Sequence, residues 1–245
     1  MRHTHQTIAQ NIARVREKIN RACHACGRSP EEVQLLLATK TVPAEVIRMA
    51  IDAGERLIGE NKVQELRDKD AALQGLPVER HFIGHLQSNK IKDVLKYATC
   101  IQSLDRLSIA EQLHQRLQAE GRTLNVYVQV NTSEESSKFG ITPEETVPFI
   151  QALQRFDTLH LKGLMTIGLL DADPEWRRPS LRRLRLLRNK LHREGVAGPL
   201  GLSMGMSGDM EMAIEEGATL VRIGTAVFGN RVPGKEVWDE SSAGR

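Results

Sequence analysis

The chain alternates between short apolar runs and longer amphipathic patterns, and this alternation decides the class of fold. We expect strands at residues 33–39, 56–59, 80–84, 99–103, 124–131, 161–167, 200–203 and 219–223. We expect helices near residues 43–53, 61–73, 88–97, 106–120, 143–155, 180–194 and 208–216, with a last helix beginning near residue 225. Strands that alternate with helices are typical of parallel βα units. Eight such units after one extra N-terminal helix predict an α/β fold, a single (β/α)8 TIM barrel.

A doubly wound open sheet is the alternative fold for this pattern. That fold usually carries a Gly-x-Gly-x-x-Gly turn after its first strand, and no such turn follows residues 33–39. The length of 245 residues matches the roughly 250 residues typical of one barrel. We therefore predict one barrel domain over residues 1–231 and a polar C-terminal tail over residues 232–245.

The N-terminal helix is predicted from an apolar stripe at helical spacing, formed by Ile8, Ile12, Val15 and Ile19. Cys23 and Cys26 continue this stripe in a Cys-x-x-Cys motif. A four-ligand zinc site would need a second pair of ligands, and a redox motif would normally follow a strand. We interpret both cysteines as small buried apolar residues.

The composition argues against several partners. A net charge of +3 is too small to indicate nucleic acid or membrane binding. No apolar segment approaches the roughly 18 to 20 residues that span a bilayer, and the N-terminus lacks the hydrophobic segment of a secretory signal. An odd number of cysteines, three, indicates a reducing compartment. We expect a cytoplasmic protein.

One basic stretch, residues 176–193, contains no acidic residue. Its cations are Arg177, Arg178, Arg182, Arg183, Arg185, Arg188, Lys190 and Arg193. A nucleic-acid surface is one interpretation. The leucines of this stretch keep helical spacing, so we favour the solvated face of a barrel helix and expect no nucleic-acid partner.

The carboxyl ends of barrel strands converge on one mouth, where such proteins place their chemistry. Lys40 follows the apolar run of residues 33–39 and must be solvated, paired or chemically used there. Burial at this strand end and a nearby cation would favour the neutral amine that attacks a carbonyl. Lys40 is therefore the first candidate for a Schiff-base nitrogen.

A phosphate site is indicated after the seventh and eighth strands. We expect Ser207 to cap a helix over residues 208–216, and Gly224 and Thr225 to open the last helix. Free N–H groups at helix starts attract anions, and barrels commonly bind phosphate at these two loops. Considered separately, Ser207 could be only a helix cap, and Gly224 and Thr225 only a turn. Because they follow adjacent strands and lie opposite Lys40 in the predicted barrel, together they favour an anion site.

A lysine amine and a phosphate site together suit pyridoxal 5′-phosphate (PLP). Arg222, on the eighth strand, could face the pyridine nitrogen of this cofactor. Because arginine stays cationic and only donates hydrogen bonds, it would keep that nitrogen unprotonated and weaken the cofactor as an electron sink. The alternative for Arg222 is a salt bridge in the barrel interior.

Six segments resemble the PLP homeostasis proteins, also called the YggS/PROSC family, and run in the order found there. They are residues 38–41 (ATKT), 59–61 (GEN), 81–90 (HFIGHLQSNK), 163–167 (GLMTI), 203–210 (SMGMSGDM) and 221–229 (VRIGTAVFG). The resemblance extends from about residue 8 to residue 231. It implies a barrel like the N-terminal domain of alanine racemase, with PLP bound as a Schiff base.

The resemblance also implies roles for single residues. Lys40 would carry PLP covalently, while Ser207, Gly224 and Thr225 would hold its phosphate. Arg222 would face the ring nitrogen, and the residues lining the pocket would be Asn61 and Met206. The resemblance implies a protein that binds and supplies PLP, with PLP-dependent apoenzymes as partners, no catalytic residues and no established turnover.

Two enzymes are rivals to this interpretation. An alanine-racemase-like enzyme needs a second acid/base, which an extra domain of a partner chain supplies in that family, and this chain ends about twenty residues after its eighth strand. The missing domain also makes a monomer our expectation. A lysine-dependent aldolase would need another acid/base near Lys40, and none is evident. His81 and His85 flank a strand end, so we expect no metal site.

Overall fold

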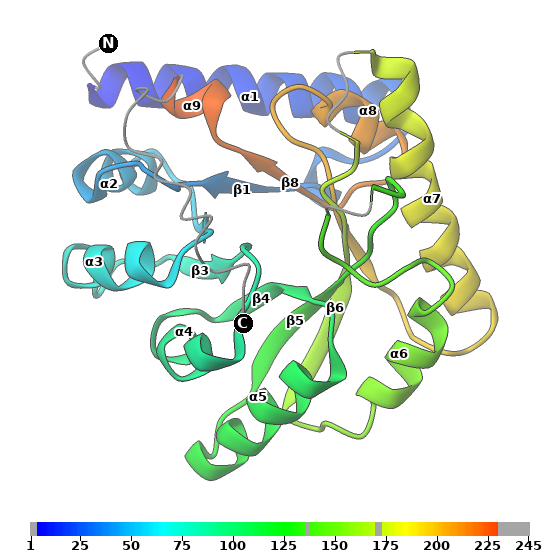
Figure 1. Ribbon diagram of the computed structural model, residues 1–245. Coiled ribbons are helices and arrows are strands. Elements are labelled where there is room, and N and C mark those ends of the chain that lie inside the picture. Colours follow the sequence, from blue (N-terminus) through cyan, green and yellow to red (C-terminus); the bar gives the residue numbers. More distant parts are fainter. Residues whose placement is uncertain (1–3, 136–137, 170–172, 230–245) are drawn as a thin grey trace.

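The computed structural model describes residues 4–135, 138–169 and 173–229, and in them eight parallel strands form one closed barrel (Figure 1). The strands are β1 (Gln34–Ala38), β2 (Leu57–Glu60), β3 (Glu79–Phe82), β4 (Cys100–Leu104), β5 (Leu124–Gln129), β6 (Leu159–Met165), β7 (Gly201–Ser203) and β8 (Leu220–Ile223). Each strand pairs with the next along the chain, and β8 closes the barrel on β1. The predicted TIM barrel is confirmed, whereas the predicted tail over residues 232–245 lies outside the described residues.

Helices follow the strands and surround the barrel (Figure 1). They are α1 (His5–Ala25), α2 (Ala44–Asp52), α3 (Val63–Leu73), α4 (Ile91–Tyr97), α5 (Leu107–Glu120), α6 (Thr146–Leu153), α7 (Pro174–Arg193), α8 (Met210–Glu215) and α9 (Thr225–Phe228). Two short 3-10 turns are η1 (Pro30–Glu32) and η2 (Ser88–Lys90). The predicted start of α7 at residue 180 was wrong, because this helix continues through Pro179 and begins at Pro174.

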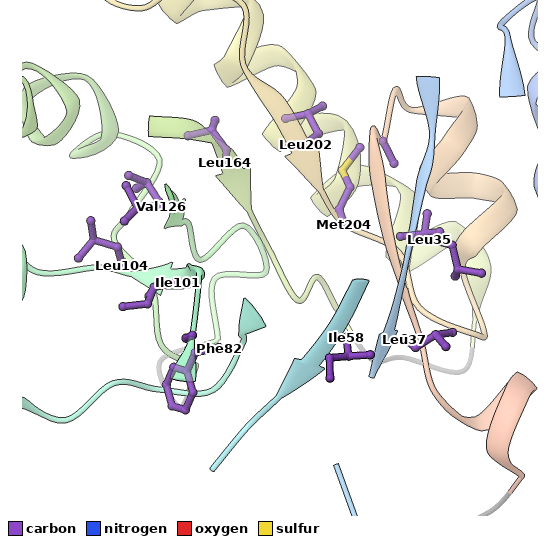
Figure 2. Close-up of a cluster of buried hydrophobic side chains, with 14 of the residues drawn as sticks. Leu35, Leu37, Ile58, Phe82, Ile101, Leu104, Val126, Leu164, Leu202 and Met204 are labelled. Carbon is purple, nitrogen blue, oxygen red and sulfur yellow. The ribbon is translucent and has the colours of Figure 1, made fainter. Parts of the chain in front are cut away.

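Two apolar layers follow from the alternation of side chains along each strand. The outer layer packs between the strands and the surrounding helices. Figure 2 shows part of it, with labelled side chains from Leu35, Leu37, Ile58, Phe82, Ile101, Leu104, Val126, Leu164, Leu202 and Met204. The inner positions form smaller separate clusters, one of which contains Leu36, Leu57 and Leu220. A second inner cluster contains Cys100, Tyr127 and Met165.

Helix α1 lies against α2, α8 and α9 and covers the place where the barrel closes (Figure 1). Its predicted apolar stripe is buried, and Cys23 belongs to it. The prediction for Cys26 was wrong: this thiol is exposed where the helix ends, and it contacts the carbonyl oxygens of Ala22 and Cys23. Cys26 is the C-cap residue, one position beyond the last helical residue Ala25, so helical spacing overestimated its burial.

The basic helix α7 forms ion pairs with neighbouring parts of the barrel. Glu216, just after α8, is almost fully buried and accepts hydrogen bonds from Arg178, Arg182 and Arg185. Burial alone would raise the pKa of Glu216, but these three guanidinium groups outweigh it and lower that pKa. Three arginines of α7 are therefore held in ion pairs within the chain, which favours the helix-face interpretation.

Every helix in the described part of the chain is too short or too polar to cross a lipid bilayer.

Candidate functional site

Lys40 lies at the carboxyl end of β1, as predicted. The ladder between β1 and β2 pairs Ala38 with Gly59 and extends one residue further, since Thr39 N donates to Gly59 O at 3.0 Å. The alternation of the strand places Lys40 on the same face as Leu36, which faces the barrel interior. Asn61, two residues after Gly59, lies at the same level on the next strand. Lys40 and Asn61 are both half-buried.

Arg222 lies deeper in the barrel than Lys40, on β8, where it pairs in register with Leu36 of β1. Its guanidinium is buried in the barrel interior and donates to Ser203 Oγ at 2.8 Å and Thr166 O at 2.7 Å. Burial lowers the pKa of Arg222 to about 10, an effect that nearby Asp209 partly opposes, so the group stays cationic at neutral pH. These contacts are hydrogen bonds to neutral groups rather than the salt bridge considered as the alternative.

The guanidinium begins a chain of hydrogen bonds that crosses the barrel interior. Ser203 Oγ accepts from Arg222 and donates to Gln102 Oε1 at 2.6 Å. The amide nitrogen of Gln102 lies 2.7 Å from His81 Nδ1. Since Gln102 Nε2 can only donate, His81 Nδ1 is the acceptor and the proton of the neutral ring is on Nε2. We call Arg222, Ser203, Gln102 and His81 the polar chain; its single direction of donation fixes the orientation of the guanidinium.

Sequence reasoning missed the polar chain beyond Arg222. Its members come from β3, β4, β7 and β8, and no local motif connects them. The available signal was the presence of polar residues inside strands: Gln102 and Ser203 are both fully buried. A buried polar side chain needs a partner, so their positions could have indicated a polar barrel interior, though not its pairings.

Ser207, Gly224 and Thr225, which we call the phosphate cup, lie on the loops after β7 and β8. Gly224 is the N-cap residue of α9 and Thr225 is its first residue, as predicted. Ser207 and Thr225 are exposed, and Ser207 Oγ accepts from the N–H of Ala226 at 3.3 Å, which joins the two loops. Among the described residues, none accepts a hydrogen bond from the N–H of Ser207 or Gly208. These N–H groups can therefore receive an anion.

The prediction that Ser207 caps the helix after β7 was wrong. Helix α8 begins at Met210 with Asp209 as its N-cap, and Asp209 Oδ1 accepts from the N–H of Met206 at 2.6 Å. The helix starts two residues later than predicted, so the Ser207 hydroxyl contacts the next loop instead of its own helix. Met206 is half-buried, and its backbone is held by this contact with Asp209.

The fold and the residues at the barrel mouth define a class of protein, and comparison with known proteins confirms that class. A family model described as "Alanine racemase, N-terminal domain" matches residues 5–232. An alanine racemase structure from Clostridium difficile is 16% identical with a TM-score of 0.73, and the match covers 95% of this chain and 58% of that chain. At this level of identity the likeness concerns the fold alone.

Much more similar proteins give a narrower family. A "Pyridoxal phosphate homeostasis protein" of Aquifex aeolicus is 43% identical over 222 residues, 91% of this chain and 97% of its own. A protein of the same name from Pseudomonas aeruginosa is 45% identical over 225 residues, 92% of this chain and 96% of its own. The structure of PipY from Synechococcus elongatus with PLP bound is 32% identical, with a TM-score of 0.80 and coverage of 91% of this chain and 100% of that chain. The chain belongs to the family of pyridoxal phosphate homeostasis proteins.

Proposed function

We propose that this chain binds PLP covalently through Lys40 and takes part in the homeostasis and supply of that cofactor. The observation that carries the proposal is the arrangement at the closure of the barrel. Lys40 follows β1 at the barrel mouth, and the buried cation Arg222 lies on the paired strand β8, with Gly224 and Thr225 of the phosphate cup just beyond that strand. The name and cofactor of the relatives support the same function.

The chemistry of the donors fits the three parts of PLP. The cofactor phosphate needs N–H and hydroxyl donors, which the exposed phosphate cup offers. The ring nitrogen needs a partner in the interior, and the guanidinium of Arg222 has N–H donors beyond the two that Ser203 and Thr166 accept. The aldehyde needs an amine, which Lys40 would supply. Asn61 and Met206 would line the space between these groups.

When bound, PLP supplies an electron sink at its pyridine ring. Arg222 only donates hydrogen bonds, and the polar chain holds it in one orientation, so it would stabilise an unprotonated ring nitrogen. An unprotonated ring withdraws electrons weakly. These residues therefore favour a protein that holds and delivers PLP over one that turns over amino acids. The recipients would be PLP-dependent apoenzymes of the cytoplasm, and the protein itself would be a monomer.

A racemase is the second candidate because the same barrel serves that reaction. The match with the alanine racemase from C. difficile covers 58% of that chain and is 16% identical, so it concerns the barrel fold alone. Two-base racemisation needs an acid/base on each face of the cofactor. The described residues at the mouth offer Lys40 for one face, and no observation assigns a group to the other.

Borohydride reduction of the wild-type protein tests the proposed function. Incubation with PLP should give a visible absorbance band, and reduction should convert the adduct into a form that survives denaturation and gel filtration. We expect about one pyridoxyl group per chain, because one lysine ends β1. Complete release of the cofactor from the reduced, denatured protein would rule out covalent binding.

The Arg222→Glu substitution tests the assignment of the ring nitrogen. A carboxylate would favour the protonated ring, so the pH at which the absorbance of the bound cofactor changes should rise. Spectra recorded between pH 5 and pH 9 would measure this shift, with Arg116→Glu on the exposed face of α5 as the control. A pH profile identical to that of the wild type would contradict the placement of Arg222 at the ring nitrogen.

A further inference from the structure

The backbone on both sides of Lys40 is held by charged side chains outside the barrel interior. Thr39 precedes Lys40, and its carbonyl oxygen accepts a hydrogen bond from Lys69 Nζ at 2.9 Å. Thr41 follows Lys40, and its N–H donates to both carboxylate oxygens of Glu65, at 3.1 and 3.2 Å. The residues before and after the proposed cofactor lysine therefore have separate charged partners.

These partners belong to one cluster between β2 and α3. Lys69 Nζ donates to Glu60 Oε1 at 2.8 Å and also to Glu65, so Lys69 joins the two carboxylates. Thr39 Oγ1 donates to the same Glu60 oxygen at 2.6 Å. Lys69 and Glu60 are both buried. We call Glu60, Glu65 and Lys69 the Lys69 cluster; it has charge-assisted contacts with Thr39 and Thr41 but lies on the outer side of the strands.

The conformation of Thr41 indicates that this cluster imposes a constraint. Its φ of +64° is in the left-handed region, which is unfavourable for a β-branched residue. Such a conformation persists when the surrounding contacts determine it, and it is frequent at functional sites. Two kinds of contact hold this turn: the N–H of Val42 donates to Thr39 O at 2.9 Å across Lys40 and Thr41, and the N–H of Thr41 donates to Glu65. The chain thus turns sharply, directly after Lys40.

We propose that the Lys69 cluster is a positioning device that fixes the backbone of Lys40 and so directs its amine toward the aldehyde of the cofactor. The inference rests on the proposed function and adds three residues to it, none of which needs to contact PLP. Lys69 forms an ion pair with Glu60 Oε1 at 2.8 Å, and the other oxygen, Glu60 Oε2, is buried without a hydrogen-bond partner among the described residues. Loss of Lys69 should therefore affect the backbone of Lys40 more than the phosphate cup.

Two substitutions test the positioning role. Glu65→Ala removes both acceptors of the Thr41 N–H, whereas Glu65→Gln keeps one. We expect Glu65→Ala to slow covalent trapping of PLP by about tenfold to a hundredfold at saturating cofactor, because misplacement of a reacting group costs that much. Glu65→Gln should restore most of the rate. The affinity for pyridoxine 5′-phosphate, which has no aldehyde and cannot form the adduct, should change little in both variants.

Lys69→Met removes the group that joins Glu60, Glu65 and the Thr39 carbonyl, so we expect a larger effect on trapping than from Glu65→Ala. Glu55→Gln is its matched control. Glu55 lies just before β2, is buried and is paired with Arg16 at 2.7 Å, but it lies at the opposite end of the strand from Glu60. Both variants should be less stable than the wild type, and only Lys69→Met should slow trapping on Lys40. Equal trapping rates for Lys69→Met, Glu65→Ala and the wild type would overturn the proposal.

Hydrogen exchange of the Thr41 amide provides a readout that does not depend on the cofactor. Without PLP, exchange in Glu65→Ala should be about tenfold faster or more than in the wild type, since the amide loses its acceptor. Unchanged exchange would overturn the positioning role. If wild-type protein forms no adduct on Lys40 while exchange behaves as expected, the proposed function fails but the backbone constraint stands.

Discussion

The Lys40→Ala variant is expected to lose the covalent PLP adduct completely. Alanine offers no amine, and Lys40 is the lysine that follows β1 at the barrel mouth, beside the strand β8 that carries Arg222. Arg222 and the phosphate cup should still bind the cofactor reversibly, with affinity reduced by about tenfold or more, which corresponds to a loss of about 1.4 kcal/mol or more. Absorbance spectra before and after borohydride, followed by denaturing gel filtration, would measure both effects.

Lys96→Ala is the control for this experiment. Lys96 is an exposed lysine on α4 that pairs with Asp93, and it is remote in sequence from the strand ends that form the site. It should keep the wild-type spectrum and adduct. An adduct of wild-type yield in Lys40→Ala would assign the chemistry to another side chain and would end the proposed function.

Gly84→Ala is expected to lower the stability of the fold more than any other substitution proposed for this chain. A Cβ atom at residue 84 would lie 2.0 Å from the backbone carbonyl oxygen of Asn61, a contact that requires the backbone to move. Overpacking against a fixed backbone costs about 3 kcal/mol, and a chain of this size loses roughly 2 to 4 °C in Tm for each kcal/mol. We therefore expect a fall in Tm of about 6 to 12 °C by thermal unfolding. The shift at Asn61 should also weaken cofactor binding.

Gly198→Ala is the matched control because nothing lies within 4 Å of the Cβ that it would add. Gly198 lies between α7 and β7, outside both elements. Its replacement should leave Tm within about 1 °C, since a surface substitution of this kind is usually worth less than 0.5 kcal/mol. Equal Tm values for the two alanine variants would contradict the close approach of the loops after β2 and β3.

The order of the strands could be predicted from the sequence because most strands contain a short apolar run between helical patterns, although β3 (Glu79–Phe82) is largely polar. The position of Lys40 could also be predicted, since parallel strands in a barrel place their carboxyl ends at one mouth. Contacts between loops that are distant in sequence could not be predicted. Ser207 looked like a helix cap in sequence, but its hydroxyl contacts the N–H of Ala226, and only the closed barrel brings these residues together.

The Lys69 cluster illustrates a second limit of the sequence. Glu65 and Lys69 have the spacing of an ordinary surface pair on a helix, which would be worth a few tenths of a kcal/mol. The structure adds the buried Glu60 and the backbone of Thr39 and Thr41 to that pair. Helical spacing predicts the ion pair between Glu65 and Lys69. The contact of this pair with the backbone after β1 depends on how α3 packs against the barrel, which the spacing does not show.

Peptide mapping of the borohydride-reduced protein tests the central claim most directly. After reduction and proteolysis, mass spectrometry should find the pyridoxyl group on the peptide that contains Lys40, and fragmentation should place it on that side chain. The account predicts this modification at a level of about one per chain, with little on other lysines. A pyridoxyl group mapped mainly to a different lysine, or spread over the surface lysines, would contradict it.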